Sequence, residues 1–330
     1  MRLHLDTDLG SDPDDACALA MLLGTPDVEL VGITTTIDPG GIRAGMVREV
    51  LAVAKGHEAR AVSKGHEARA VARDRDVPIA AGAEVTLTSR TTPGDIPTGD
   101  RWWPRPITPR PSPPGAALDL LAASLESGAT VVAIGPYTNL ALLETLRPGS
   151  LSQGPIVLMG GWVGGRLPEG FPAWEADRDW NVQCDPYAAR VVFDAATDLT
   201  LVTIAATIRV PVCASDLPRL EAAGALGELL ARQARAQGEA HYAGVGRRYS
   251  RLPDDLLNFH HDPLACAVAA GWDGADAGVR RLVPVEERGV LRFAEDPAGR
   301  PVKVVDEVDG DAFREHWFRC IERAAAHPQP

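Results

Sequence analysis

The residues that could do chemistry gather first near the N-terminus, directly behind an apolar segment. Within residues 6–15 the chain places five aspartates, namely Asp6, Asp8, Asp12, Asp14 and Asp15. Two carboxylates about 4 Å apart repel by about 4 kcal/mol at an effective dielectric constant of about 20. A bound divalent cation removes this repulsion, and oxygen ligands without thiolates favour Ca²⁺ or Mg²⁺ over zinc. The cluster therefore predicts a site for a hard cation.

Helix capping is a second interpretation of the same cluster. Acidic side chains are favoured at a helix N-terminus, and a helix is predicted to begin near Asp14. Capping can account for Asp12, Asp14 and Asp15. It does not account for Asp6 and Asp8, which alternate at the end of the preceding strand.

Short apolar segments alternate with helical patterns over the first two thirds of the chain. Strands are predicted at residues 3–6, 28–35, 77–80, 129–134, 155–159 and 199–205, and helices at residues 14–23, 44–71, 116–127, 139–146 and 186–195. This alternation predicts an α/β fold with a doubly wound, mostly parallel sheet. Ligands of such sheets bind beyond the carboxyl ends of the strands, where Asp6 and Asp8 stand.

The C-terminal part has a different pattern. Residues 279–285, 290–293 and 302–308 read as a β-meander, followed by a helix over residues 311–325. We expect residues 279–325 to form a small lobe of the same domain. Residues 1–330 are therefore expected to be a single domain.

Two further stretches interrupt the pattern. Residues 54–62 recur almost unchanged as residues 63–71, a tandem nine-residue repeat that we expect to lie within a surface helix. Residues 85–115 hold eight prolines, and a loop of that length is typical of a lid or a binding loop.

The composition limits the partners. A formal net charge of −12 argues against binding to nucleic acid or to an anionic membrane, and no apolar run approaches the length of a membrane span. The chain opens directly in a predicted strand without a signal peptide, so a cytoplasmic location is expected. A small neutral or cationic ligand, or a metal, fits this charge better.

Six blocks of the sequence, in order, resemble the nucleoside hydrolases, in particular the inosine-uridine preferring type. They cover residues 3–270 and comprise Asp6-Thr7-Asp8 with Asp14-Asp15-Ala16, Gly32–Thr35, residues 133–140 (AIGPYTNL), Met159-Gly160-Gly161, Trp180-Asn181 with Asp185-Pro186, and His261-Asp262-Pro263-Leu264. The resemblance implies hydrolysis of the N-glycosidic bond of a purine or pyrimidine nucleoside, giving free base and ribose.

The same resemblance implies one Ca²⁺ ion. Its ligands would be the side chains of Asp8, Asp15 and Asp262 and the backbone carbonyl of Ile134. Asp8 would also act as general base toward a water molecule. His261 would act as general acid toward the leaving base, with His260 and His241 as competing candidates.

The implied substrate contacts depart in part from the family pattern. Ribose would contact Asp14, Asn181 and Asp179, and Asp179 stands where the family usually has glutamate. An asparagine with which the family contacts ribose has no counterpart here. Met159 would form the pocket floor, and we expect Tyr242 and Tyr249 to close over the base. The resemblance further implies a homodimer or homotetramer.

Two alternatives remain open at this point. One is a degenerate member of the family that binds a sugar or nucleoside without cleaving it. The other is a haloacid-dehalogenase-like phosphatase, which also begins with a strand and Asp-x-Asp. That class prefers Thr or Val where this chain has Gly10, and it leaves His261-Asp262 unexplained.

Overall fold

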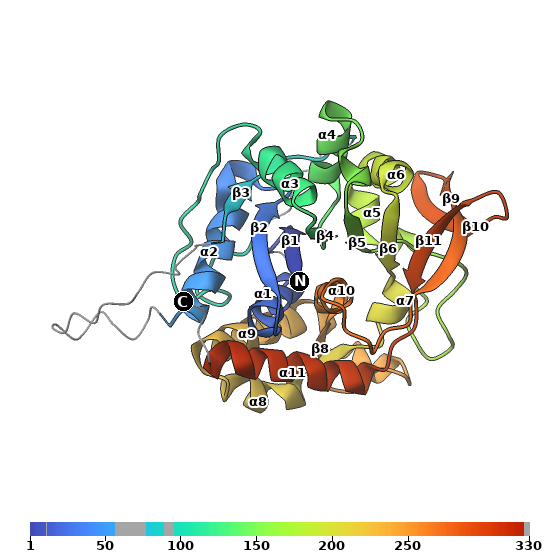
Figure 1. The fold of residues 1–330 in the computed structure, drawn as a ribbon. Coiled ribbons are helices and arrows are strands. Elements are labelled where there is room, and N and C mark those ends of the chain that lie inside the picture. The colour runs from blue at the N-terminus through green and yellow to red at the C-terminus, as the bar shows by residue number, and fades with distance from the viewer. Residues whose placement is uncertain (11, 57–76, 89–95, 327–330) are drawn as a thin grey trace.

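A nine-stranded sheet forms the centre of the protein (Figure 1). The computed structural model describes residues 1–10, 12–56, 77–88 and 96–326. The strands of this sheet are β1 (Arg2–Thr7), β2 (Glu29–Thr35), β3 (Ile79–Ala81), β4 (Thr130–Ala133), β5 (Pro155–Met159), β6 (Asp198–Val202), β9 (Gly278–Glu287), β10 (Val290–Glu295) and β11 (Arg300–Val305). Their order is β10-β9-β11-β6-β5-β4-β1-β2-β3.

All pairings from β3 to β11 across the sheet are parallel, as the alternating pattern predicts. Strand β1 alternates between apolar and polar side chains, yet both of its faces are buried. Leu3 and Leu5 are buried on one face, while His4 and Asp6 are buried on the other. Helices cover both faces, so each face needs side chains that tolerate burial.

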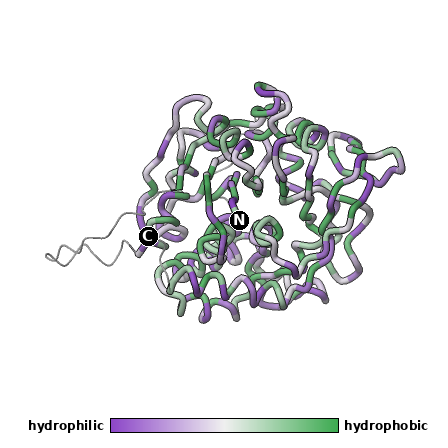
Figure 2. The backbone as a smooth tube through the Cα atoms, in the orientation of Figure 1, coloured by the Kyte–Doolittle hydropathy of each residue, from purple (hydrophilic) through white to green (hydrophobic). Residues whose placement is uncertain are grey.

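The helices form two layers. On one face lie α3 (Ala116–Glu126), α4 (Thr138–Leu146) and α6 (Pro186–Ala195); on the other lie α1 (Asp14–Gly24), α2 (Ile42–Ala54), α9 (Gly224–Gln237), α10 (His261–Ala269) and α11 (Gly310–Ala326) (Figure 1). Each layer packs on the sheet through its own apolar cluster. The outer helix α11 alternates between hydrophilic and hydrophobic residues along its length (Figure 2), as expected of a helix with one buried face.

The C-terminal strands continue the central sheet. Strand β11 pairs in parallel with β6, and β9 and β10 add antiparallel partners beyond it. The rings of Phe193 on α6 and Phe293 on β10 stack with centroids 4.7 Å apart, which joins this part to the main core. The predicted β-meander and helix are thus present, and they belong to the main sheet and to the layer of α1.

One predicted strand is wrong at its end. The apolar pattern over residues 199–205 predicts a single strand, but β6 ends at Val202 and the short helix α7 (Ile204–Thr207) follows. Thr203 adds a hydrogen bond to Val305 of the neighbouring strand and then begins the helix. An apolar run of this length does not distinguish a buried strand from a strand followed by a buried helical turn.

The sequence pattern predicted no strands or helices for the segment between α7 and α10. It contains β7 (Pro211–Cys213) and β8 (Leu256–Phe259), which pair antiparallel, together with α8 (Leu217–Glu221) and α9. Strand β8 leads directly into α10 and so places His260, His261 and Asp262.

The two unusual stretches are described only in part. The helix predicted over residues 44–71 is wrong at its end, because α2 (Ile42–Ala54) is followed by a turn in which Gly56 has a φ of 67°. Residues 57–71 of the tandem repeat lie outside the described residues. In the proline-rich segment, Trp103 is buried and the backbone of Arg110 donates to the carbonyl of Gly41 at the start of α2. Its later described residues pack along α2 and α9, where Arg232 donates to the carbonyl of Asp100, whereas Leu87 and Thr88 donate to the carboxylate of Asp185. Within the described ranges no helix has both the length and the apolar character needed to cross a bilayer.

Candidate active site

The candidate site lies where the order of the sheet reverses, between β1 and β4. Asp8 follows β1, and Ile134 follows β4. The two strand ends approach closely, because a Cβ atom on Gly135 would lie 2.8 Å from Oδ1 of Asp8. Such switch points are the usual ligand sites of doubly wound sheets.

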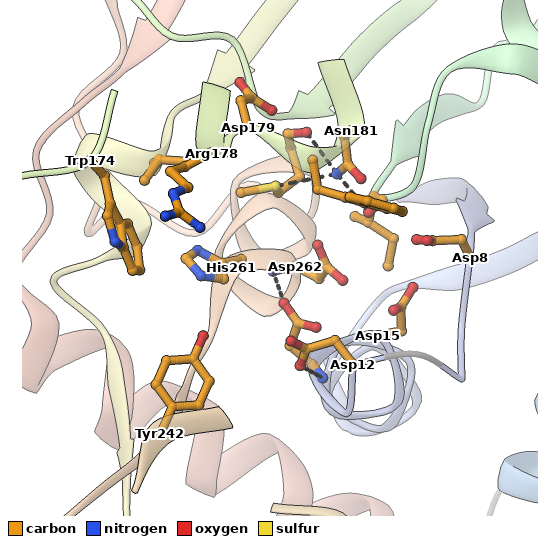
Figure 3. Close-up of a pocket in the computed structure, with 15 residues that line it drawn as sticks. Asp8, Asp12, Asp15, Trp174, Arg178, Asp179, Asn181, Tyr242, His261 and Asp262 are labelled. Carbon is orange, nitrogen blue, oxygen red and sulfur yellow. Dashed lines mark hydrogen bonds between the residues drawn. The ribbon is translucent and has the colours of Figure 1, made fainter. Parts of the chain in front are cut away.

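A cavity of about 440 Å³ opens at this point, a size typical of small-molecule sites. Figure 3 shows the side chains that surround it. It is lined by Asp8, Asp12, Asp14, Asp15, Ile134, Met159, Trp174, Arg178, Asp179, Trp180, Asn181, Ile204, Tyr242, His261 and Asp262.

Three carboxylates form the centre of the site. Asp14 and Asp15 stand in the first turn of α1, and Asp262 stands in the first turn of α10. One oxygen of each lies within 4.8 Å of the others, and all three side chains are buried. The backbone N–H of Asp262 donates to Asp14 at 3.3 Å, and the hydroxyl of Thr7 donates to Asp15.

Helix capping explains only one aspartate of this region. The N-cap residue of α1 is Pro13, and Asp12 accepts a hydrogen bond from the backbone N–H of Asp14 at 3.3 Å. Asp12 is also held by the side-chain amides of Gln237 and Asn258. Asp14 and Asp15 instead turn their carboxylates toward the cavity.

Electrostatics make the cluster costly without a counter-charge. Burial raises the pKa values of the Asp14, Asp15 and Asp262 carboxyls well above their ordinary value, and repulsion among neighbouring aspartates raises them further. Arg43 behind the site lowers the pKa of Asp15 in part. The donor set consists of carboxylate oxygens alone, which suits a hard divalent cation. The residues therefore fit a metal site.

Asp8 lies beside this cluster (Figure 3). Burial raises the pKa of its carboxyl, whereas the positive charge of Arg43 and a hydrogen bond from Trp180 lower it. The guanidinium of Arg43 also donates to the backbone carbonyls of Asp8 and Leu9, which fixes the turn after β1.

Two of the residues expected to contact ribose, Asn181 and Asp179, are already hydrogen-bonded within the protein. Nδ2 of Asn181 donates to the carbonyls of Ile134 at 2.9 Å and Met159 at 3.1 Å. Asp179 accepts from the backbone N–H of Gly161 at 2.6 Å and of Val182 at 3.3 Å, and it caps α5 (Trp180–Cys184). Asp179 thus connects the residues that follow β5 to the first turn of α5.

His261 is the histidine that the fold brings into the cavity. Its Nδ1 lies 2.6 Å from the hydroxyl of Thr207. Burial lowers the pKa of the imidazole to about 4, which favours its neutral form. Of the competing candidates, His260 is buried against Trp317 with ring centroids 4.3 Å apart, and His241 is exposed outside the cavity lining.

The aromatic residues are placed unequally. Tyr242 lines the cavity and packs edge-on against Phe259, with ring centroids 5.7 Å apart. Tyr249 packs on the same Phe259 cluster but is not among the described residues that line the cavity. Trp174 lines the cavity from the segment between β5 and α5.

Sequence reasoning did not single out Arg178, Trp174, Trp180 and Ile204 as lining residues. Arg178 and Trp174 lie in the part of the chain that departs from the family pattern, so no motif marked them. Trp180 could have been found, because it directly precedes Asn181 in a matched block.

Comparison with known proteins gives the same assignment. The sequence profile of the family "Inosine-uridine preferring nucleoside hydrolase" matches residues 3–315. The pyrimidine-specific ribonucleoside hydrolase RihA of Salmonella paratyphi A is 27% identical over 231 residues, which cover 68% of this chain and 67% of that protein.

Solved structures share the fold. The plant nucleoside hydrolase PpNRh1 superposes with a TM-score of 0.71 at 21% identity, over 97% of this chain and 98% of its own. The purine-preferring ribonucleoside hydrolase from Gardnerella vaginalis gives a TM-score of 0.71 at 22% identity, over 98% and 99%. Because the family profile extends over nearly the whole sequence, the protein belongs to the inosine-uridine preferring nucleoside hydrolase family.

Proposed function

We propose that the protein is a Ca²⁺-dependent hydrolase that cleaves the N-glycosidic bond of a purine or pyrimidine nucleoside to free base and ribose. The observation that carries this proposal is the group of three buried carboxylates, within 4.8 Å of one another, in a cavity that also holds Asp8 and His261. Family membership supports the reaction class.

Asp15 and Asp262 would hold the cation, together with Asp8 and the carbonyl of Ile134. Asp14 lies in the same cluster, and we assign it to the ribose hydroxyls. When bound, Ca²⁺ supplies positive charge that neutralises the carboxylates, orients the sugar hydroxyls and makes a water molecule more acidic.

Asp8 would take the proton from the attacking water. Burial raises the pKa of its carboxyl, which makes the carboxylate a stronger base, and the charge of Arg43 and the hydrogen bond from Trp180 offset part of that rise. The water oxygen then bonds to C1′ as the bond from C1′ to the base nitrogen breaks. The surrounding carboxylates stabilise the positive charge that develops on the sugar ring.

His261 would donate a hydrogen bond to the leaving base, which departs with the bonding electron pair and takes its proton from solvent. A low pKa disfavours the imidazolium, so we assign the donor role to the neutral imidazole. If the hydroxyl of Thr207 donates to Nδ1, the imidazole carries its proton on Nε2 and presents it to the cavity. Tyr242 and Trp174 would pack against the base, as aromatic rings do at nucleobase sites.

Family membership argues against the phosphatase, and the residues of the site argue against a binding protein without catalytic activity. Membership in the nucleoside hydrolase family removes the reason for a phosphatase. A degenerate binding protein would not need Asp8 and His261 in one cavity with the carboxylate cluster.

Base release from inosine and uridine, measured with and without a chelator, tests the proposal. We expect hydrolysis that the chelator abolishes and added Ca²⁺ restores. Asp15→Asn should abolish it, and the exposed Asp177→Asn serves as the matched control. Binding of nucleoside without release would instead identify a degenerate member.

A further inference from the structure

Arg178 is the one arginine or lysine among the described residues that line the cavity, in which six residues are aspartates. It ends the short 3₁₀ turn Ala176–Arg178, one residue before Asp179. Figure 3 shows its guanidinium directed into the cavity toward His261, between Trp174 and Asn181. A cation is therefore held at one wall of a strongly acidic site.

The guanidinium of Arg178 has no carboxylate of the described residues within 4.0 Å and no hydrogen bond from its side chain. Its neighbour in the same loop differs, because Arg166 pairs with Glu175 at 3.8 Å. Other described arginines have such partners, for example Arg219 with Glu315 and Glu322 at 2.7 Å. Arg178 is exposed at the mouth of the cavity, and its five donors are free of protein partners among the described residues.

The polar groups beside Arg178 are partly engaged within the protein. Each oxygen of Asp179 accepts one backbone hydrogen bond, and Nδ2 of Asn181 donates to two carbonyls. Arg178 differs from them, because its side chain makes no hydrogen bond to the described residues. Guanidinium groups bind phosphate and carboxylate through two parallel hydrogen bonds.

One aspartate, Asp179, shares this wall with Arg178, and each of its oxygens accepts a backbone hydrogen bond. Asp8, Asp12 and Asp15 lie on the far side of His261 and Asp262 from Arg178 (Figure 3). The carboxylate cluster is itself where the proposed function places the divalent cation. An anionic group at Arg178 would therefore be separated from the repulsive half of the cavity.

We propose that Arg178 is a specificity-determining residue that recognises an anionic substituent of the substrate, either a phosphate on the sugar or a carboxylate on the base. This inference rests on the proposed function and narrows its substrate class from neutral nucleosides to anionic ones.

The test compares three pyrimidine substrates that differ in the charged group: uridine, uridine 5′-monophosphate and orotidine. Release of uracil or orotate is measured at saturating Ca²⁺ for the wild-type protein, Arg178→Ala, Arg178→Lys and the matched control Arg166→Ala. We expect the wild-type protein to give a higher kcat/KM for one anionic substrate than for uridine. Arg178→Ala should lower that value about 10- to 100-fold and should lower the value for uridine by less, whereas Arg166→Ala should change neither.

If Arg178→Ala lowers kcat/KM for uridine 5′-monophosphate, the recognised group is a sugar phosphate. If it lowers kcat/KM for orotidine, the recognised group is a carboxylate on the base. Arg178→Lys should retain part of the preference, because a lysine keeps the charge but not the two-pronged geometry. An equal loss for uridine and the anionic substrates in Arg178→Ala would overturn the inference, as would a wild-type preference for uridine over both.

A binding measurement separates this inference from the hydrolase proposal. If no substrate releases base, calorimetric titration with ribose 5-phosphate, orotate and ribose is decisive for Arg178. Tighter binding of an anion than of ribose, lost in Arg178→Ala, would uphold anion recognition even as the hydrolase proposal fails. Equally tight binding of the anions to the wild-type protein and to Arg178→Ala would refute anion recognition by Arg178.

Discussion

The hydroxyl of Thr207 lies 2.6 Å from Nδ1 of His261, and this contact joins the end of α7 to the first residue of α10. The sequence predicted that the strand before Thr207 would continue to residue 205, but the strand ends earlier and α7 takes its place. Because the chain turns into a helix there, Thr207 reaches the histidine and can set which ring nitrogen carries the proton.

Removal of this hydroxyl should slow hydrolysis. Thr207→Val keeps the side-chain volume and is expected to lower kcat about 5- to 10-fold, which corresponds to one lost hydrogen bond. Thr207→Ser should restore most of the rate, and His261→Ala should cost about 10²- to 10⁴-fold. Steady-state kinetics with a nucleoside substrate measures all three. An unchanged kcat in Thr207→Val would show that Thr207 does not position His261.

Asp14 and Asp15 are adjacent in sequence but are assigned different roles. Asp15→Asn should weaken Ca²⁺ binding by more than the about 10- to 100-fold typical of losing an outer-shell partner. Asp14→Asn should retain Ca²⁺ more tightly than Asp15→Asn and raise KM for the nucleoside. Calorimetric titration with Ca²⁺, paired with kinetics, separates the two. The assignment would be reversed if Asp14→Asn lost the metal and Asp15→Asn kept it.

His4 should make the protein less stable in acid. It is buried between the hydroxyls of Ser124 and Thr34, and burial lowers the pKa of its imidazole from 6.5 to about 3. Between these pH values the unfolded chain binds a proton that the folded chain does not. The contribution of His4 to stability is therefore complete above pH 6.5 and is lost as the pH falls toward 3.

At pH 4 this loss amounts to about 3 kcal/mol relative to neutral pH. Urea unfolding of the wild-type protein and of His4→Gln at several pH values measures it. We expect a shallower decline for His4→Gln, whose side chain does not titrate. Parallel declines in the two proteins would contradict the assignment.

The stacked pair of Phe193 and Phe293 should be essential to stability. Both rings are buried, and they join α6 to β10. Phe193→Ala is expected to lower the free energy of unfolding by about 3–5 kcal/mol, whereas Phe193→Leu should lower it by less. A single cooperative transition is expected in each case, because the C-terminal strands share the core of the main sheet. Separate melting of residues 278–326 would show that they form an independent unit.

The strands and helices that the sequence predicted well are those with strong local signals. Residues 155–159 and 186–195 were predicted with the bounds that the structure has, β5 and α6. Each of these segments begins at a proline and has the apolar pattern of one element type. The place of β11 beside β6 could not be predicted, because parallel pairing between distant segments leaves no local pattern.

The carboxylate cluster was found from the crowding of like charges at a strand end, a signal that requires no knowledge of the fold. Asp262 and His261 were placed only by resemblance, because strand β8 brings them to the cavity from more than 240 residues away. Arg178 was missed because its loop carries no motif, and its exposure to the cavity depends on the turn before Asp179. The homo-oligomeric state stays a prediction.

The central claim is that buried aspartates hold Ca²⁺ so that this chain can hydrolyse a nucleoside. Stepwise addition of Ca²⁺ to chelator-treated protein, with calorimetry and base release measured on the same samples, tests it most directly. The account predicts one Ca²⁺ bound per chain and hydrolysis that rises in proportion to the bound fraction, with neither in Asp15→Asn. Full base release from protein that binds no Ca²⁺ would contradict it.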